Sequence, residues 1–252
     1  MRKLLIYNIT IYFESFKVEV LKKTVDATRM ITHVPATKPP EYGVSDGVNL
    51  VPINKLAEIK SPWKRYVVIG AGKTGLDALL YLFDNNVDPE KILWIVSNDC
   101  WFFSRDLFGD NLKNFPKVFP LFFGALIASE DVNDAYKRSE DVGQFMRLDK
   151  KIWPTKMRAA TVSSSEMEKL RSITNIIRLG RVDRIEQDKI IFKQGDTIPT
   201  DNETLHIDCS TAGTNFPLVK DKIYDGNHIY LQMVQMPQPC TSGAMIAALE
   251  LK

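Results

Sequence analysis

Three glycines stand at the spacing GxGxxG in the segment GAGKTG, residues 70–75. In dinucleotide-binding proteins each of the three glycines has a separate structural role. Gly70 would allow the chain to turn tightly at the end of a strand. Gly72 would let the backbone approach a pyrophosphate, and Gly75 would let the following helix pack on the strand. The backbone N–H groups at the start of that helix, aided by its dipole, would hold the phosphate charge. The spacing therefore predicts a pyrophosphate site at residues 70–75.

The segments on either side predict the elements that such a site requires. YVVIG at residues 66–70 is a short apolar run that ends in glycine, which favours a buried strand. LDALLYLFDNN at residues 76–86 has apolar residues at helical spacing before an Asn-Asn stop, and KILWIVS at residues 91–97 predicts a second buried strand. Strand, glycine turn, helix and strand fit within about thirty residues, the length of one βαβ unit. This setting strengthens a motif that is weak by itself.

The glycine spacing is also compatible with two competing structures. The first is a purely structural turn. The second is the phosphate loop of a nucleotide triphosphatase, whose GKT end matches Gly72, Lys73 and Thr74. That loop needs a glycine five residues before Gly72, where this chain has Val67 within the predicted strand. We therefore expect a dinucleotide, with Ala71, Lys73 and Thr74 at its phosphates or Lys73 in solvent.

The end of the second predicted strand bears on the choice between NADP and NAD. An acidic residue about twenty positions after the motif accepts hydrogen bonds from the ribose of NAD. Ser97 and Asn98 occupy the expected contact positions, so no carboxylate stands there to repel a 2′-phosphate. This favours NADP, with Arg105 as a partner for the phosphate. A shift of one residue would bring Asp99 into contact and favour NAD instead.

The histidines and cysteines show no comparable pattern. His33, His206 and His228 are scattered without metal-ligand spacing, so we expect strand or loop positions and no metal site. No two cysteines form a CxxC pair, which excludes dithiol chemistry, and all three are expected to be structural. They are Cys100, Cys209 and Cys240. No acid, base or nucleophile can be assigned a catalytic role.

Two further groups are expected to be structural. The serines at residues 163–165 lack the GxSxG setting of a hydrolase and predict a helix cap. Trp101, Phe102 and Phe103 could stack on a cofactor ring, but core packing is the expected role.

Composition limits the class of protein. The 252 residues are 44% apolar and 25% charged, as in soluble globular proteins, and the net charge of +2 gives no field that would favour nucleic acid. No apolar run approaches the roughly 18 residues of a transmembrane helix, so we expect no membrane span. The odd number of cysteines and the lack of a disulfide framework fit a reducing compartment, so we expect a cytoplasmic location.

The remaining segments predict a mixed architecture. Residues 1–34 favour two or three strands, and residues 35–62 an extended connection. One helix is expected near residues 130–139, and another at Ser165, with Glu168 at capping-box spacing and Met167, Leu170 and Ile173 buried. Residues 176–210 predict a β-meander that ends in the buried strand LHIDCS, and residues 242–252 predict a terminal helix.

With these residues assembled, the chain resembles the FAD/NAD(P)-binding oxidoreductases of the two-dinucleotide-domain class. That class includes proteins similar to flavin-containing monooxygenases and to pyridine nucleotide-disulfide oxidoreductases. The resemblance rests on four segments spread over nearly the whole chain. They are VDAT at residues 25–28, VIGAGKTGLDA at 68–78, IDCSTAGT at 207–214 and QMPQPCTSGAMIAALE at 235–250.

The resemblance implies an α/β fold in which a Rossmann-like NAD(P) domain with a β-meander is inserted into a partial FAD-binding domain. VDAT and STAGT look like the two crossings, which implies that Thr211, Ala212 and Gly213 lie near the cofactor. Residues 1–60 would be partial FAD-type domain and linker, and residues 61–215 the NAD(P) domain. Residues 216–252 would return to the FAD-type domain.

The implied activity is transfer of hydride from NADPH to flavin, as in flavoprotein monooxygenases, with an unidentified small-molecule substrate. The family's first GxGxxG, which holds the FAD pyrophosphate, has no counterpart before residue 66. FAD binding is therefore the weaker expectation, and a truncated, non-catalytic remnant that binds a dinucleotide or a partner is the alternative. The oligomeric state is open, with a homo-oligomer as one expectation.

Overall fold

The computed structural model describes residues 5–11, 14–28, 34–108, 115–210, 222–234 and 239–251. The chain divides into two compact units. One unit is a single continuous stretch, Val34–Thr211, and the other joins Met1–His33 to Ala212–Lys252. The middle of the chain is thus an insertion between two segments that belong together. The assignment of these units to NAD(P)-type and FAD-type domains, with the boundaries given above, stays a prediction.

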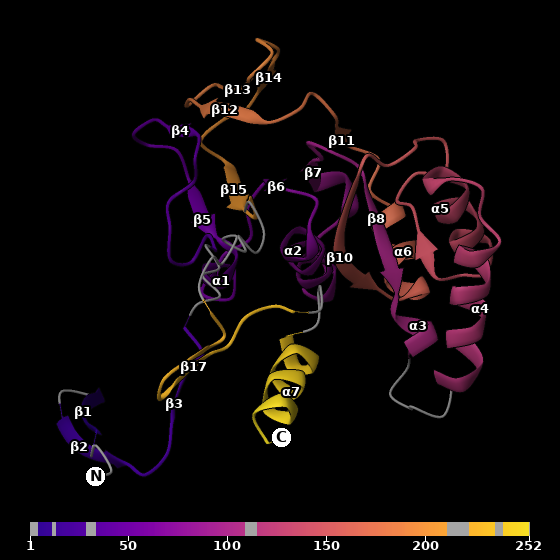
Figure 1. The fold of residues 1–252 in the computed structure, drawn as a ribbon. Helices are drawn as coiled ribbons and strands as arrows, with labels where there is room; N and C mark the ends of the chain where they lie inside the picture. The colour runs from indigo at the N-terminus through magenta and orange to yellow at the C-terminus, as the bar shows by residue number, and fades with distance from the viewer. Residues whose placement is uncertain are drawn as a thin grey trace. The chain divides into compact units, whose positions relative to one another are not determined.

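A five-stranded parallel sheet forms the centre of the continuous unit (Figure 1). Across the sheet the strands follow the order β11 (Ile176–Ile177), β7 (Ile92–Ile95), β6 (Arg65–Ile69), β15 (Thr204–Asp208) and β5 (Leu50–Pro52). All four neighbouring pairs run parallel. Helix α2 (Lys73–Asp84) connects β6 to β7 and completes the predicted βαβ unit, followed by the short 3-10 helix η1 (Pro89–Lys91). The Rossmann-type α/β fold expected from the sequence is confirmed.

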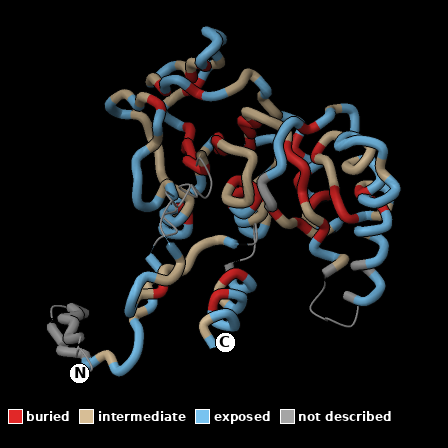
Figure 2. The backbone as a smooth tube through the Cα atoms, viewed as in Figure 1, coloured by how far each residue is buried: buried red, intermediate tan, exposed pale blue. Residues whose placement is uncertain are grey.

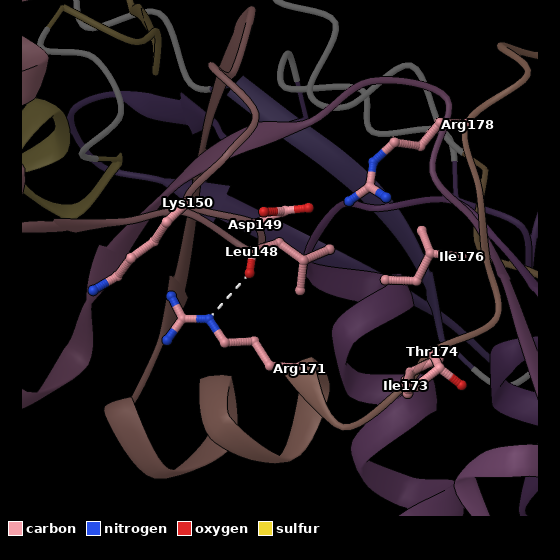
Figure 3. Close-up of a pocket in the computed structure, with 8 residues that line it drawn as sticks. All are labelled: Leu148, Asp149, Lys150, Arg171, Ile173, Thr174, Ile176 and Arg178. Atoms are coloured by element: carbon pink, nitrogen blue, oxygen red, sulfur yellow. Dashed lines mark hydrogen bonds between the residues drawn. The ribbon is translucent and has the colours of Figure 1, made fainter.

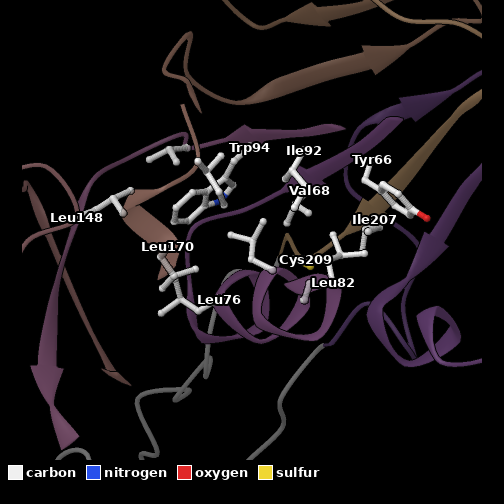
Figure 4. Close-up of a cluster of buried hydrophobic side chains, with 14 of the residues drawn as sticks. Tyr66, Val68, Leu76, Leu82, Ile92, Trp94, Leu148, Leu170, Ile207 and Cys209 are labelled. Atoms are coloured by element: carbon white, nitrogen blue, oxygen red, sulfur yellow. The ribbon is translucent and has the colours of Figure 1, made fainter. Parts of the chain in front are cut away.

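Residues along the central strands alternate between two apolar clusters, because successive strand side chains point to opposite faces. Tyr66 and Val68 face the helical side, together with Trp94 and with Leu76 and Leu82 of α2 (Figure 4). Helix α6 (Ser164–Arg171) adds Met167 and Leu170 to the same cluster. Figure 2 shows that the central strands β6, β7 and β15 are largely buried.

The opposite face of the sheet is covered by a second, smaller sheet. Its strands are β14 (Thr197–Pro199), β13 (Lys189–Phe192), β12 (Val182–Ile185) and β4 (Gly43–Val44). Val67 and Ile69 of β6 pack against Ile185, Ile190 and Phe192 of this sheet. Strands β12, β13 and β14 pair antiparallel in succession, which confirms the predicted meander.

The segment between β7 and α6 contains both helices and strands. It contains β8 (Cys100–Ser104), α3 (Arg105–Phe108), α4 (Phe115–Ile127), α5 (Val132–Asp141), β9 (Phe145–Met146) and β10 (Lys156–Val162). Strand β8 pairs with both β9 and β10. The helix expected near residues 130–139 is confirmed as α5. The sequence does not predict helix α4, because Pro120 and a nearly continuous apolar run obscure any helical periodicity.

Two sequence predictions in this unit need correction. The capping box of α6 joins Ser163 and Glu166, so the prediction that Ser165 and Glu168 form it is wrong. The predicted buried face is nevertheless confirmed, since Met167, Leu170 and Ile173 are buried. Residues 35–62 are not merely a connection, because they contain β4, β5 and α1 (Ile53–Leu56). Strand β5 is recruited to the sheet edge by pairing with β15, which its short proline-flanked sequence does not reveal.

The second unit contains the chain's first and last elements. They are β1 (Leu5–Ile11), β2 (Glu14–Val20), β3 (Thr24–Asp26), β16 (Tyr224–Asp225), β17 (His228–Tyr230) and α7 (Pro239–Glu250). Strand β3 pairs parallel with β17, which joins the two segments of the unit in one sheet. The predicted early strands and terminal helix are confirmed. Among the described residues, no helix combines the length and the apolar character needed to cross a membrane.

Candidate functional site

The glycine turn leaves β6 at its carboxyl end and enters α2. Gly70 has φ +125°, in the left-handed range that favours glycine, and its amide donates to the Ile95 carbonyl at 3.1 Å. A Cβ atom at Gly70 would lie 2.6 Å from the carbonyl oxygen of Cys209. A Cβ atom at Gly75 would overlap the carbonyl oxygen of Gly70. Both glycines are therefore required by the packing of the protein itself.

Gly72 differs from Gly70 and Gly75. Its φ of −86° is accessible to any residue, and a Cβ atom there would have no described heavy atom within 4 Å. It is the N-cap of α2 but offers no side chain for capping. Neither backbone conformation nor internal packing among the described residues explains a glycine here. Open space in front of the backbone is what the approach of an external ligand requires.

The amides beside Gly72 are suited to an anion. The N–H groups of Lys73, Thr74 and Gly75 belong to the first turn of α2, so they have no intrahelical acceptor. The first such bond runs from the Leu76 amide to the Gly72 carbonyl at 3.1 Å. Aligned peptide dipoles place a partial positive charge at this end of the helix. Lys73 forms an ion pair with Asp77 on the exposed surface, so it adds no free cation.

The two residues expected to contact the adenine ribose, Ser97 and Asn98, lie just beyond the carboxyl end of β7. Both residues are half-buried and follow β7 after one intervening residue, Val96. Asp99 is engaged elsewhere, because Arg178 donates to its carboxylate from Nε at 3.0 Å and from Nη2 at 3.3 Å. The Asp99 side chain is 11% exposed. The carboxylate that would favour NAD is therefore neutralised by a partner that follows β11.

Arg105 lies at the start of α3, beyond the far end of β8. A five-residue strand separates Cys100 from Ser104 by about 13 Å. The Arg105 guanidinium donates to Glu166 of the α6 capping box at 3.0 Å and to the Thr161 carbonyl at 3.3 Å. Arg105 therefore hydrogen-bonds to Glu166 of α6, whereas Arg178 hydrogen-bonds to Asp99, the residue next to Asn98.

A cavity of about 460 Å³ opens beside Arg178 (Figure 3). Its lining residues are Leu148, Asp149, Lys150, Arg171, Ile173, Thr174, Ile176 and Arg178. Arg171 is committed to backbone carbonyls, since its Nε donates to Leu148 at 3.0 Å and its Nη2 to Arg147 at 2.5 Å. Three basic residues and one acidic residue give the lining a net positive charge.

Some of the remaining predicted site residues and histidines lie outside the described part of the chain. Thr211, Ala212 and Gly213 lie outside the described residues, as does His33. His206 is buried in β15, where its Nδ1–H donates to the Asn49 carbonyl at 3.0 Å and its Nε2 accepts from Thr200 at 2.9 Å. Burial lowers the pKa of His206, and the Asn49 bond opposes this. Within the described ranges, no cluster of ligating side chains could hold a metal ion.

The cysteines and aromatic residues follow their predicted structural roles with one exception. Cys100 and Cys209 are buried, and burial strongly raises the pKa of Cys209, so this thiol remains protonated. Cys240 is exposed, so it is not buried as expected of an isolated structural cysteine. Trp101 and Phe102 are core residues as predicted, and Trp101 stacks on Tyr136 with ring centroids 5.0 Å apart.

Comparison with known proteins places the chain among longer relatives. No family model matches it. It is 36% identical over 238 residues to uncharacterized proteins of Mycobacterium tuberculosis and Mycobacterium bovis. The match covers 93% of this chain and 44% of each relative, so the chain spans less than half the length of these proteins. A similar solved structure is L-lysine 6-monooxygenase from Pseudomonas syringae, with 13% identity, a TM-score of 0.46, and coverage of 98% of this chain and 67% of that chain.

Proposed function

We propose that the continuous unit binds NADP(H) at the glycine turn, as the nicotinamide-nucleotide site of a flavin-dependent, monooxygenase-like oxidoreductase. One observation carries the proposal: Gly72 faces open space, while Gly70 and Gly75 are explained by internal packing. The residues present fit a pyrophosphate, since the first-turn amides of α2 supply donors and the absent Cβ of Gly72 removes the obstacle to close approach.

The chain's own residues bind and orient the nucleotide in this proposal. The amides of residues 71–75 hold the pyrophosphate at the carboxyl edge of the sheet, where ligands of open α/β sheets bind. Ser97 and Asn98 face the adenine ribose. Bound NADPH would supply a hydride for a flavin, and the protein's part is positioning and electrostatics.

A preference for NADP over NAD follows from the ion pair between Asp99 and Arg178. NAD-specific sites use a free carboxylate as acceptor for the ribose hydroxyls. Here that carboxylate already accepts two hydrogen bonds from Arg178. The Arg178 guanidinium also brings positive charge next to Asn98, where a 2′-phosphate would lie.

Flavin binding and oxygenation belong to the proposal for the whole protein, because the chain spans 44% of its curated relatives. The chain contains a single GxGxxG, and this observation favours a second candidate function. In that alternative the chain binds NADP(H) or a partner without FAD and performs no redox chemistry. Stoichiometric FAD binding to the purified protein would reject the alternative, while NADP(H) binding without FAD would support it.

Isothermal calorimetry with NADPH and NADH tests the nucleotide site directly. Gly72→Val places a branched side chain in the open space, and we expect at least a tenfold loss of NADPH affinity, about 1.4 kcal/mol. Gly124→Val is the matched control, because a Cβ atom built on Gly124 of α4 likewise meets no heavy atom of the described residues within 4 Å. This control should bind NADPH like the unaltered protein. Equal affinity in a folded Gly72→Val protein would refute the site.

A further inference from the structure

The cavity beside Arg178 lies at β11, the edge strand of the central sheet. Strand β7 separates β11 from β6, which leads into the glycine turn, and none of the lining residues belongs to that turn or to residues 97–98. The cavity volume of about 460 Å³ is within the range of small-molecule sites. Lys150, Arg171 and Thr174 are exposed, so a ligand can reach the cavity from solvent without opening the fold. The cavity is therefore a candidate for a site separate from the glycine turn.

Part of the lining is apolar. Leu148 and Ile173 belong to the buried cluster on the helical side of the sheet, and Ile176 packs against that cluster. Contact of an apolar group with these side chains is favourable because it removes apolar surface from water. A ligand for this cavity should therefore carry an apolar body.

The other part of the lining offers unused N–H donors. Arg178 holds Asp99 through Nε and Nη2, and Arg171 binds two backbone carbonyls through the same two nitrogens. Nη1 of each guanidinium, like Nζ of Lys150, has no acceptor within the described part of the chain. Figure 3 shows the Arg178 guanidinium directed toward Asp149, in the middle of the lining. Three cationic side chains therefore keep donors for a ligand.

The single carboxylate of the lining does not neutralise these cations. Oδ1 of Asp149 accepts from the Lys151 amide at 2.8 Å. Among the described residues, Asp149 forms no ion pair with a basic side chain of the cavity. Even when Asp99 is counted as the partner of Arg178, three basic side chains face two acidic ones. The cavity therefore favours an anion.

These two parts of the lining together define the chemistry of the ligand. Guanidinium N–H groups form charge-assisted hydrogen bonds with carboxylate oxygens, whereas a neutral base gains nothing from the excess positive charge. An inorganic anion would leave the apolar part of the lining without a contact. A small organic carboxylate with an apolar body uses both parts.

We propose that this cavity binds a small organic carboxylate with an apolar body, and that the bound carboxylate weakens NADPH binding through Arg178. The carboxylate accepts from Nη1 of Arg178 while Nε and Nη2 stay on Asp99. It then offsets the positive charge that attracts the 2′-phosphate of NADPH, so this coupling rests on the proposed function. NADH has no 2′-phosphate and is not affected. Because coupling between two sites is reciprocal, NADPH weakens carboxylate binding by the same factor.

Calorimetry with phenylacetate tests the cavity without any nucleotide. Phenylacetamide has the same apolar body without the charge and should bind at least tenfold more weakly. Lys150→Met should weaken phenylacetate binding about tenfold, since it removes a cation with no partner among the described residues. Lys151→Met is the matched control, because Lys151 is the exposed neighbour and does not line the cavity. Absence of phenylacetate binding, equal binding of the amide, or equal losses in the two lysine variants would each overturn the inference.

Titration of NADPH with and without saturating phenylacetate tests the coupling. We expect about a fivefold loss of NADPH affinity, no change for NADH, and no coupling in Arg178→Leu. Complete exclusion of phenylacetate by 2′,5′-ADP at saturation would make the cavity part of the nucleotide site and overturn the separate site. Equal NADPH affinity with and without phenylacetate would overturn the role of Arg178. Phenylacetate binding by a protein that binds no NADPH would instead overturn the proposed function and leave the carboxylate site in place.

Discussion

The indole N–H of Trp94 donates a 2.9 Å hydrogen bond to the carbonyl oxygen of Gly70. Trp94 lies on β7 and is completely buried between the sheet and α2 (Figure 4). The bond connects the second strand of the βαβ unit to the turn that ends the first. The Gly70 amide is fixed in the same way, by the carbonyl of Ile95. One strand therefore holds both polar groups of the residue that sets the direction of the glycine turn.

Replacing Trp94 by phenylalanine should lower the free energy of unfolding, because the Gly70 carbonyl then stays buried without its partner. The hydrogen-bond part of this loss is about 1–3 kcal/mol. Trp101→Phe is the matched control, since Trp101 is equally buried but its Nε1 has no partner among the described residues. Urea unfolding of both variants should show the larger loss for Trp94→Phe. Equal losses would mean that the bond contributes nothing.

Gly75→Ala should destabilise the fold although it adds a single methyl group. The new Cβ would overlap the Gly70 carbonyl oxygen, so α2 must move away from the sheet. Overpacking of this kind costs about 1–3 kcal/mol. Gly72→Ala should change stability by less than about 0.5 kcal/mol, because its Cβ meets open space. Thermal unfolding of the pair measures the difference, and a Gly75→Ala protein as stable as the unaltered chain would contradict the packing argument.

Arg178→Leu should reduce the preference for NADPH over NADH. The substitution removes positive charge beside Asn98 and releases the Asp99 carboxylate, which can then accept from the ribose of NADH. We expect NADPH affinity to fall about tenfold while NADH affinity is kept. Arg105→Leu decides between the two arginines, because Arg105 is paired with Glu166. If Arg105→Leu alters the preference and Arg178→Leu does not, Arg105 is the partner of the 2′-phosphate, as the sequence predicts.

Acidification should destabilise the protein through His206. Burial lowers the pKa of His206 from its ordinary 6.5 in the folded chain, so the unfolded chain takes up the proton first. The free energy of unfolding therefore falls as pH decreases below about 6.5. Asp106 does not interfere in this range, because hydrogen bonding from Ser164 lowers its pKa from 3.8 and its contribution is lost only at more acidic pH.

Urea unfolding at pH 7.5 and pH 5.5 measures this dependence. His206→Gln should show a smaller difference between the two conditions than the unaltered chain. His228→Gln, a substitution in β17 of the second unit, is the control and should keep the full difference. An unchanged difference in His206→Gln would assign the acid sensitivity to another group.

The local pattern of residues is sufficient to predict the βαβ unit and the meander. Strand β6, the glycine turn and α2 are adjacent in sequence, and their apolar periodicity changes from continuous to helical at Gly70. Strands β12, β13 and β14 likewise pair with their sequence neighbours. Such elements are predictable because the interactions that form them connect residues only a few positions apart.

Contacts between distant residues were decided only by the tertiary structure. Asp99 and Arg178 are separated by 79 positions, so neither the neutralisation of Asp99 nor the diversion of Arg105 to Glu166 could be inferred from spacing. The same holds for the cavity at β11, whose lining brings residues 148–150 together with residues 171–178. The sequence by itself predicted, from the spacing of three glycines between a strand and a helix, where a phosphate would approach the backbone. Only folding decided which charges and hydroxyls surround that position, because their placement depends on how the sheet is assembled.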